Sequence, residues 1–315
     1  MPFALDPELA LIVEALGGLE ALTRAPAARD DWQTVRANAD GGLALIESML
    51  DQHLEIDRSD HAATSYDGEE LLVRWYAGTS APGSAVVYLH GGGMICGSVG
   101  LYDRLVAALV ADSGVPMLAV DYRRAPEHPH PAPVEDSFAG LGWLHDQADE
   151  LGVDRDRIAV MGDSGGGGLA AAVALMARDR GVAVARQILV YPMLDDRTTT
   201  PDPELVPFAG WSYDDNYTGW HALLGDAIGS DDVDPYAAPA RATDLRGLPP
   251  TYVEVGELDI FRDESIEYAQ RLSNAGTSVE LHVHPGCAHG FDRMNPDADV
   301  VQRARADRVR AIQRV

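Results

Sequence analysis

Short apolar runs rich in β-branched residues alternate along this chain with longer segments of helical periodicity. The apolar runs predict strands at 71–76, 85–89, 116–121, 158–161, 187–191, 251–255 and 279–283. Helices are predicted at 101–112, 134–150, 167–180, 263–275 and 297–314. This alternation indicates βαβ units, and therefore an α/β fold with a mostly parallel central sheet flanked by helices.

Two segments do not follow the alternation. Residues 1–50 look helical, because Leu9, Ile12, Val13 and Leu16 form one apolar stripe. Residues 195–235 have little strand pattern but are rich in aromatic residues: Phe208, Trp211, Tyr213, Tyr217 and Trp220. These aromatics can form the core of a small subdomain or line a ligand pocket. We expect 1–50 and 195–235 to form a cap, or lid, over a core made of 51–194 and 236–315.

Charge and cysteine content exclude several classes of protein. The chain has 24 basic and 50 acidic residues, a net charge of −26, and no lysine. Such acidity disfavours nucleic acid and anionic membranes as partners, although it also serves solubility. Cys96 and Cys287 fit neither a disulfide framework nor a zinc site. The apolar run 9–19 is interrupted by Glu14, so we expect no signal peptide, no membrane insertion and a cytoplasmic location.

The strongest local motif surrounds Ser164. The apolar strand 158–161 leads into Gly162-Asp163-Ser164-Gly165-Gly166, and an Ala- and Leu-rich helix follows. This strand–turn–helix pattern is that of the nucleophile elbow of α/β-hydrolases, in which glycines allow a sharp turn that exposes the serine. A nucleotide-binding loop is the alternative, but no lysine follows the glycines. The motif predicts that Ser164 is a nucleophile.

A second motif, His90-Gly91-Gly92-Gly93, directly follows the strand 85–89. Consecutive glycines after a strand can turn their backbone N–H groups toward the oxyanion of an acyl-transfer intermediate. A flexible glycine-rich turn is the alternative. The nucleophile elbow predicted one βαβ unit later favours the oxyanion interpretation over this alternative. We interpret His90 as a structural residue that orients the loop.

A hydrolase of this kind needs an acid and then a histidine after the serine. Of the ten histidines, His289 lies in a loop just beyond the strand 279–283, where open α/β sheets place their chemistry. The acid is predicted to be Asp259, after the strand 251–255, with Glu257 as the nearest rival. Asp263 and Glu264 are expected to cap the following helix.

Taken together, these motifs resemble the bacterial hormone-sensitive-lipase family of carboxylesterases over nearly the whole chain. The matching stretches are His90–Gly93, Asp121–His128, Gly162–Gly166, Asp259–Glu264 and His289–Phe291, in that order. Residues 236–290 are most similar to the heroin-esterase branch. The sequence departs from the family pattern at Gly165, Ile260 and Met94, where alanine, proline and an aromatic residue are usual.

The resemblance implies an α/β-hydrolase fold with a helical cap and a Ser164–Asp259–His289 triad. It implies an oxyanion hole made by the amides of Gly92, Gly93 and Gly165, with no cofactor and no metal. Met94, Trp211 and Tyr213 are the residues expected in the substrate pocket. A homodimer also fits the family.

The predicted function is hydrolysis of short-to-medium acyl esters, because no long apolar lid helix typical of a true lipase is visible. An amidase or peptidase with the same triad is an alternative, since the triad does not select the leaving group. A non-catalytic ligand-binding protein on the same scaffold is a further alternative.

Overall fold

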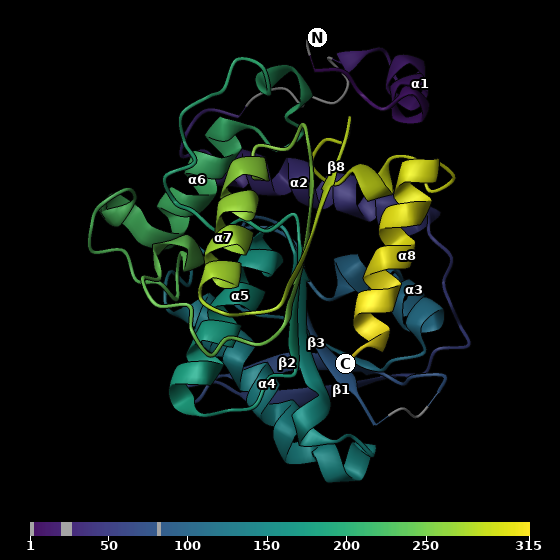
Figure 1. Cartoon of the computed structure of the whole chain (residues 1–315), viewed down its shortest axis with the longest axis vertical. Helices are drawn as coiled ribbons and strands as arrows, with labels where there is room; N and C mark the ends of the chain where they lie inside the picture. Colours follow the sequence, from purple (N-terminus) through teal and green to yellow (C-terminus); the bar gives the residue numbers. More distant parts are fainter. Residues whose placement is uncertain (1–2, 20–26, 81–82) are drawn as a thin grey trace.

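The computed structural model describes residues 3–19, 27–80 and 83–315; the remainder of the predicted helical segment 1–50, residues 1–2 and 20–26, lies outside it. Within these ranges, eight strands form one sheet accompanied by eight α-helices (Figure 1). The strands are β1 (Arg58–Thr64), β2 (Glu70–Tyr76), β3 (Ala85–Leu89), β4 (Met117–Val120), β5 (Ile158–Asp163), β6 (Arg186–Val190), β7 (Thr251–Gly256) and β8 (Val279–His284). The helices are α1 (Pro7–Ala15), α2 (Trp32–Met49), α3 (Asp103–Ser113), α4 (Ala132–Leu151), α5 (Gly165–Arg180), α6 (Tyr213–Leu224), α7 (Arg262–Asn274) and α8 (Asp299–Gln313).

The sheet has the order β1-β2-β4-β3-β5-β6-β7-β8. The strands β3 to β8 run parallel, and β2 pairs antiparallel with both β1 and β4. Every residue of β3, β4, β5 and β7 is buried, as expected for parallel strands covered on both faces. The predicted α/β class and the mostly parallel sheet are confirmed.

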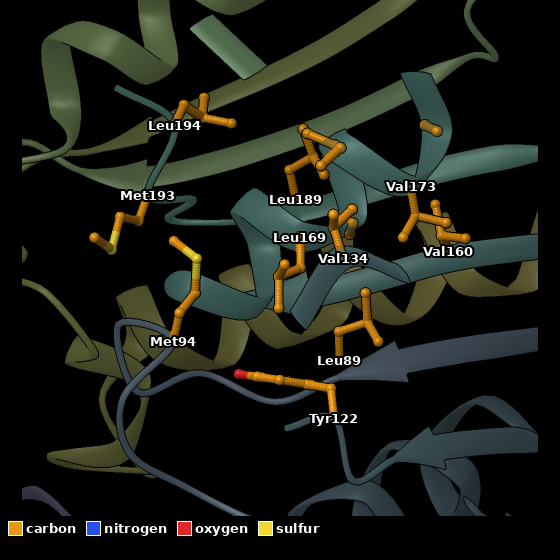
Figure 2. Packing of buried hydrophobic residues seen from close by; sticks show 14 of the residues in the cluster. Leu89, Met94, Tyr122, Val134, Val160, Leu169, Val173, Leu189, Met193 and Leu194 are labelled. Carbon is orange, nitrogen blue, oxygen red and sulfur yellow. The ribbon is translucent and has the colours of Figure 1, made fainter. Parts of the chain in front are cut away.

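Helices cover the two faces of the sheet and enclose two hydrophobic cores. In Figure 1, α3 and α8 lie together on one side of the sheet, and α4, α5 and α7 lie on the other. The core on the α5 side is shown in Figure 2, where Leu169 and Val173 of α5 lie among Leu89 and Val160 of the neighbouring strands. Close packing on both faces therefore holds the strands, and the loops at their carboxyl ends, in fixed positions.

The two segments outside the βα alternation meet above the carboxyl ends of the strands (Figure 1). The helix α2 comes from the N-terminal segment, and α6 comes from the segment 195–235. The backbone N–H of Asp30 donates to the Thr218 hydroxyl over 3.1 Å, and His221 lies 2.6 Å from the Asp30 carboxylate. No helix in the described part of the chain is both long and apolar enough to cross a bilayer.

Candidate active site

The nucleophile candidate Ser164 sits on a strained turn between β5 and α5. Its backbone has φ +54° and ψ −122°, in the left-handed half of conformational space that side chains disfavour. The turn is tight because glycines flank it: a Cβ on Gly166 would lie 2.1 Å from the carbonyl oxygen of Leu89. The backbone N–H of Ser164 donates to Val190 over 2.9 Å, which fixes the turn to β6.

Three predicted residues meet at this turn. His289 Nε2 lies 3.0 Å from Ser164 Oγ, and His289 Nδ1 lies 2.7 Å from Asp259 Oδ2. Asp259 follows β7 and His289 follows β8, so neighbouring parallel strands deliver both residues to one edge of the sheet. The other oxygen of Asp259 accepts the N–H of Phe261 over 2.9 Å. The rival acid Glu257 instead accepts the N–H of Gly286 over 2.9 Å, and so supports the loop that carries His289.

Aromatic side chains hold the imidazole of His289 from two sides. The ring of Tyr191 meets it edge-on at 4.8 Å between centroids, and Phe261 does the same at 5.1 Å. Asp259 is fully buried, whereas 14% of the His289 side chain is exposed. The ring is therefore constrained on its flanks but open toward the serine and the cavity.

The glycines after β3 lie against the elbow. Gly92 and Gly93 have φ of +117° and +56°, conformations that favour glycine. A Cβ on Gly165 would lie 2.8 Å from the backbone nitrogen of Gly93, so the loop and the start of α5 are in close contact. The N–H groups of Gly92, Gly93 and Gly165 form no hydrogen bond with another described residue. These donors are available to a negatively charged oxygen beside Ser164.

His90 lies below this loop and is buried. Its ring stacks on Tyr122 with 4.2 Å between centroids, and Nδ1 lies 2.8 Å from the carbonyl oxygen of Gly91. Burial lowers the pKa of His90, which favours the neutral imidazole. These contacts are consistent with the interpretation that His90 orients the loop and is not a catalytic base.

A buried network behind Ser164 was not predicted from the sequence. Asp163 accepts hydrogen bonds from Tyr88 at 2.6 Å, from Tyr102 at 3.2 Å and from the N–H of Gly91 at 3.2 Å. Arg293 completes the set, with Nη2 at 2.7 Å from the carboxylate. Asp163 thus ties the elbow to the glycine loop. Its place inside the Gly-x-Ser-x-Gly motif was the only signal in the sequence.

Ser164 and His289 line a cavity of about 220 Å³. Its lining includes Ser164, His289, Gly92 and Trp211, together with Leu43 and Ile46 of α2.

The structure differs from the sequence-based expectation for two of the three predicted pocket residues. Trp211 lines the cavity, but Met94 and Tyr213 are buried in the neighbouring hydrophobic core and are absent from the lining. Figure 2 shows Met94 among the core side chains, on the loop that follows β3. Its backbone turns through φ +62°, and the side chain is 1% exposed, so it packs away from the cavity.

Glu264 also differs from the expectation that it caps α7. Its buried carboxylate accepts the N–H groups of Leu194 at 2.6 Å and Asp195 at 3.3 Å, and it binds the Thr198 hydroxyl. The carboxylate therefore reaches across to the chain that leaves β6 and holds the beginning of the segment 195–235.

The described residues contain no cluster of three or more histidine, cysteine, aspartate or glutamate side chains arranged to hold a metal ion. The chemistry offered by the cavity is that of a hydroxyl, an imidazole, a carboxylate and backbone amides.

Comparison with known proteins places this chain in a family. Residues 86–293 match the family described as alpha/beta hydrolase fold. The chain is 33% identical over 298 residues to an ethyl acetate hydrolase of Pseudomonas putida, covering 92% of this chain and 93% of that protein.

Solved structures agree with this assignment. A bacterial heroin esterase superimposes with a TM-score of 0.88 and 39% identity, covering 99% of this chain and 98% of the other. A hyperthermophilic esterase of Pyrobaculum calidifontis has a TM-score of 0.84 and 33% identity, covering 99% of both chains. The chain therefore belongs to the α/β-hydrolase family, within the group related to hormone-sensitive lipase whose motifs it carries.

Proposed function

We propose that this protein is a serine carboxylesterase that hydrolyses short-to-medium acyl esters through an acyl-enzyme. The observation that carries the proposal is the chain of contacts from Asp259 through His289 to Ser164, at 2.7 and 3.0 Å. Relatives that are named as ester hydrolases support it.

In the first half-reaction His289 Nε2 takes the proton of Ser164 Oγ as the oxygen attacks the ester carbonyl carbon. Asp259 holds the Nδ1 proton of the imidazole and stabilises the imidazolium that forms. The carbonyl oxygen becomes an oxyanion, to which the N–H groups of Gly92, Gly93 and Gly165 donate. Collapse of this intermediate breaks the ester C–O bond, and His289 returns its proton to the leaving alcohol.

In the second half-reaction water takes the place of the alcohol. His289 removes a proton from the water as its oxygen attacks the acyl carbon, and the same N–H groups bind the second oxyanion. The carboxylic acid leaves as the proton returns to Ser164 Oγ. No co-reactant other than water is needed.

Substitution of the nucleophile tests the proposal. Ser164→Ala should lower kcat/KM for p-nitrophenyl acetate by roughly 10⁴-fold or more, because the covalent route is removed. It should also abolish covalent labelling by a fluorophosphonate probe. Ser273→Ala, an exposed serine on α7, is the matched control and should retain both.

Wild-type turnover by Ser164→Ala would contradict the nucleophile assignment. Absence of both hydrolysis and labelling in the wild-type protein would favour the alternative of a non-catalytic binding protein. Matched esters and anilides of the same acid separate an esterase from an amidase, and faster turnover of the anilide would overturn the ester preference.

A further inference from the structure

A second cavity, of about 270 Å³, lies beneath the C-terminal end of α2. It is enclosed by α2, α3 and α8, and the last two lie side by side in Figure 1. Half of its fourteen lining residues are apolar: Ile46, Leu50, Leu105, Ala108, Leu109, Pro296 and Val301. These side chains offer a surface to an apolar ligand.

The second cavity adjoins the one that holds Ser164. Ile46 and Arg293 line both of them. An aliphatic side chain and one arginine therefore stand where the two spaces meet. An apolar group that passes Ile46 would leave the cavity at Ser164 and contact the apolar side chains of the second cavity.

The positive charges of the arginines in the second cavity are already neutralised by carboxylates. Each arginine of its lining has a carboxylate partner. The pairs are Arg293–Asp163 at 2.7 Å, Arg305–Asp112 at 2.5 Å and Arg308–Asp292 at 2.8 Å. Paired arginines offer no excess positive charge to an anion, so the cavity favours a neutral chain over a free carboxylate.

The partition between the cavities lies on the second half of α2. This half begins with the pair Gly41-Gly42, and such a pair is a common site of helix bending. Its end is held by Arg104, whose backbone N–H donates to Glu47 and whose side chain donates to the carbonyl oxygens of Ser48 and Leu50. Ile46 itself belongs to no hydrophobic core cluster of the described residues, so its side chain can be displaced by a ligand at small free-energy cost.

We infer that the second cavity is a binding site for a linear aliphatic chain of the ester, which enters from the triad past Ile46. The inference rests on the proposed function and deepens it: the cavity at Ser164 accommodates short groups, and the second cavity extends the range to medium-length chains. Ile46 is then a specificity-determining residue. The chain is either the acyl chain or the alkyl chain of the alcohol.

Filling the second cavity tests the inference. Ala108→Phe places a ring in it, and Ala108 itself does not line the cavity at Ser164. The assay measures kcat/KM for p-nitrophenyl esters from acetate to laurate, and in a second series for acetates of alcohols from ethanol to dodecanol. Ala139→Phe, at a partly buried alanine on α4 away from both cavities, is the matched control.

The expected result is a truncated profile. Relative to p-nitrophenyl acetate, Ala108→Phe should lose at least about ten-fold in kcat/KM on octanoate or on octyl acetate, since each lost apolar contact weakens binding, whereas Ala139→Phe should keep the wild-type ratios. The series that is truncated identifies which chain occupies the cavity. Ile46→Ala should shift the same profile toward longer chains, and a thermal melt verifies that both variants fold.

Unchanged chain-length profiles in both folded variants would overturn the inference and leave the proposed function intact. Rejection of every chain longer than butyl by the wild-type enzyme, in both series, would overturn it as well. Loss of p-nitrophenyl acetate hydrolysis by the wild-type protein itself would instead count against the proposed function.

Discussion

Two helices beside Ser164, α5 and α2, are held in opposite ways. Thirteen of the sixteen residues of α5 are buried, including every residue from Gly165 to Ala177. Of the eighteen residues of α2, only Val35 and Ala39 are buried. The helix α5 begins directly after Ser164, and α2 forms a wall of the cavity that Ser164 lines.

The difference separates two tasks. The reacting atoms need positions fixed to within a fraction of an ångström, which close packing on all sides of a helix provides. A wall that admits different substrates needs freedom to move, and a helix with few buried contacts keeps that freedom. The segment that begins after β6 stands between these extremes, because one buried carboxylate, that of Glu264, holds its first residues.

The largest effect is expected at the elbow. Gly166→Ala would bring a Cβ within 2.1 Å of the carbonyl oxygen of Leu89 and 2.4 Å of that of His90, and neither backbone atom can move freely. The free energy of unfolding in urea should fall by about 4 kcal/mol or more. The control is Gly142→Ala on α4, where an added Cβ has no neighbour within 4 Å. A Gly166→Ala protein as stable as wild type would show that α5 is not rigidly held.

A smaller effect is expected one residue before the nucleophile. Asp163→Asn removes the charge that pairs with Arg293 and weakens the contact with the N–H of Gly91. The free energy of unfolding should fall by about 3 kcal/mol, since a buried partner loses its counter-charge. Because Gly91 leads into the glycine loop, kcat for p-nitrophenyl acetate should fall more than KM rises.

Arg293→Gln and the double variant complete a cycle with Asp163→Asn. A coupling energy of about 1–3 kcal/mol is expected between two residues in direct contact. Additive effects would show that the ion pair does not position the loop.

Glu264 provides a test that depends on pH. Burial raises the pKa of its carboxyl well above the ordinary value, so the folded protein keeps this proton to higher pH than the unfolded chain does. The resulting stabilisation is fully present below the unfolded pKa of about 4.3 and is lost as pH rises through the folded pKa, by at most about 1.4 kcal/mol per pH unit. Glu264→Gln should lack this loss.

The measurement is the melting temperature of the wild-type protein and of Glu264→Gln as the pH is raised from below the unfolded pKa of about 4.3. Glu267→Gln, an exposed residue of the same helix, is the control and should follow wild type. If the melting temperatures of wild type and Glu264→Gln changed with pH in the same way, the raised pKa of Glu264 would be contradicted.

The smallest effect is expected in α2. Gly41 has no atom within 4 Å of an added Cβ, so Gly41→Ala should stabilise the helix by about 0.5–1 kcal/mol through backbone entropy. If α2 opens separately from the core, hydrogen exchange of its amides should slow about five-fold while the urea midpoint stays unchanged. A matching rise in the midpoint would show that α2 unfolds with the core, and the contrast with α5 would fail.

The elements that could be predicted best from the sequence are the strands whose residues are buried. Parallel strands buried on both faces read as continuous apolar runs, and all seven predicted strands are present. The edge strand β1 was missed because only Ala63 of its seven residues is buried, so Arg58–Thr64 lacks an apolar pattern. Ser164, Asp259 and His289, which the structure brings into contact, could be singled out because each lies in a loop that follows a strand.

Tertiary contacts between segments that are distant in the sequence could not be predicted from local sequence patterns. Asp163 and Arg293 are 130 positions apart, and no local pattern links them. Glu264 read as a helix cap because its position in the first turn of α7 was visible, whereas its contact with the chain after β6 was not. Met94 followed the glycines in sequence, but the turn of the loop directs its side chain into the core.

The side chain of Arg36 connects α2 to the glycine loop that follows β3. Arg36 of α2 donates to the carbonyl oxygens of Ile95 and Ala125 and pairs with Glu127 at 2.6 Å. Ile95 lies two residues beyond Gly93, so α2 rests directly on the glycine loop that follows β3. For the evolution or engineering of new substrate ranges, Arg36 marks one point where the first fifty residues are fastened to this loop, so a replacement segment must supply equivalent donors there.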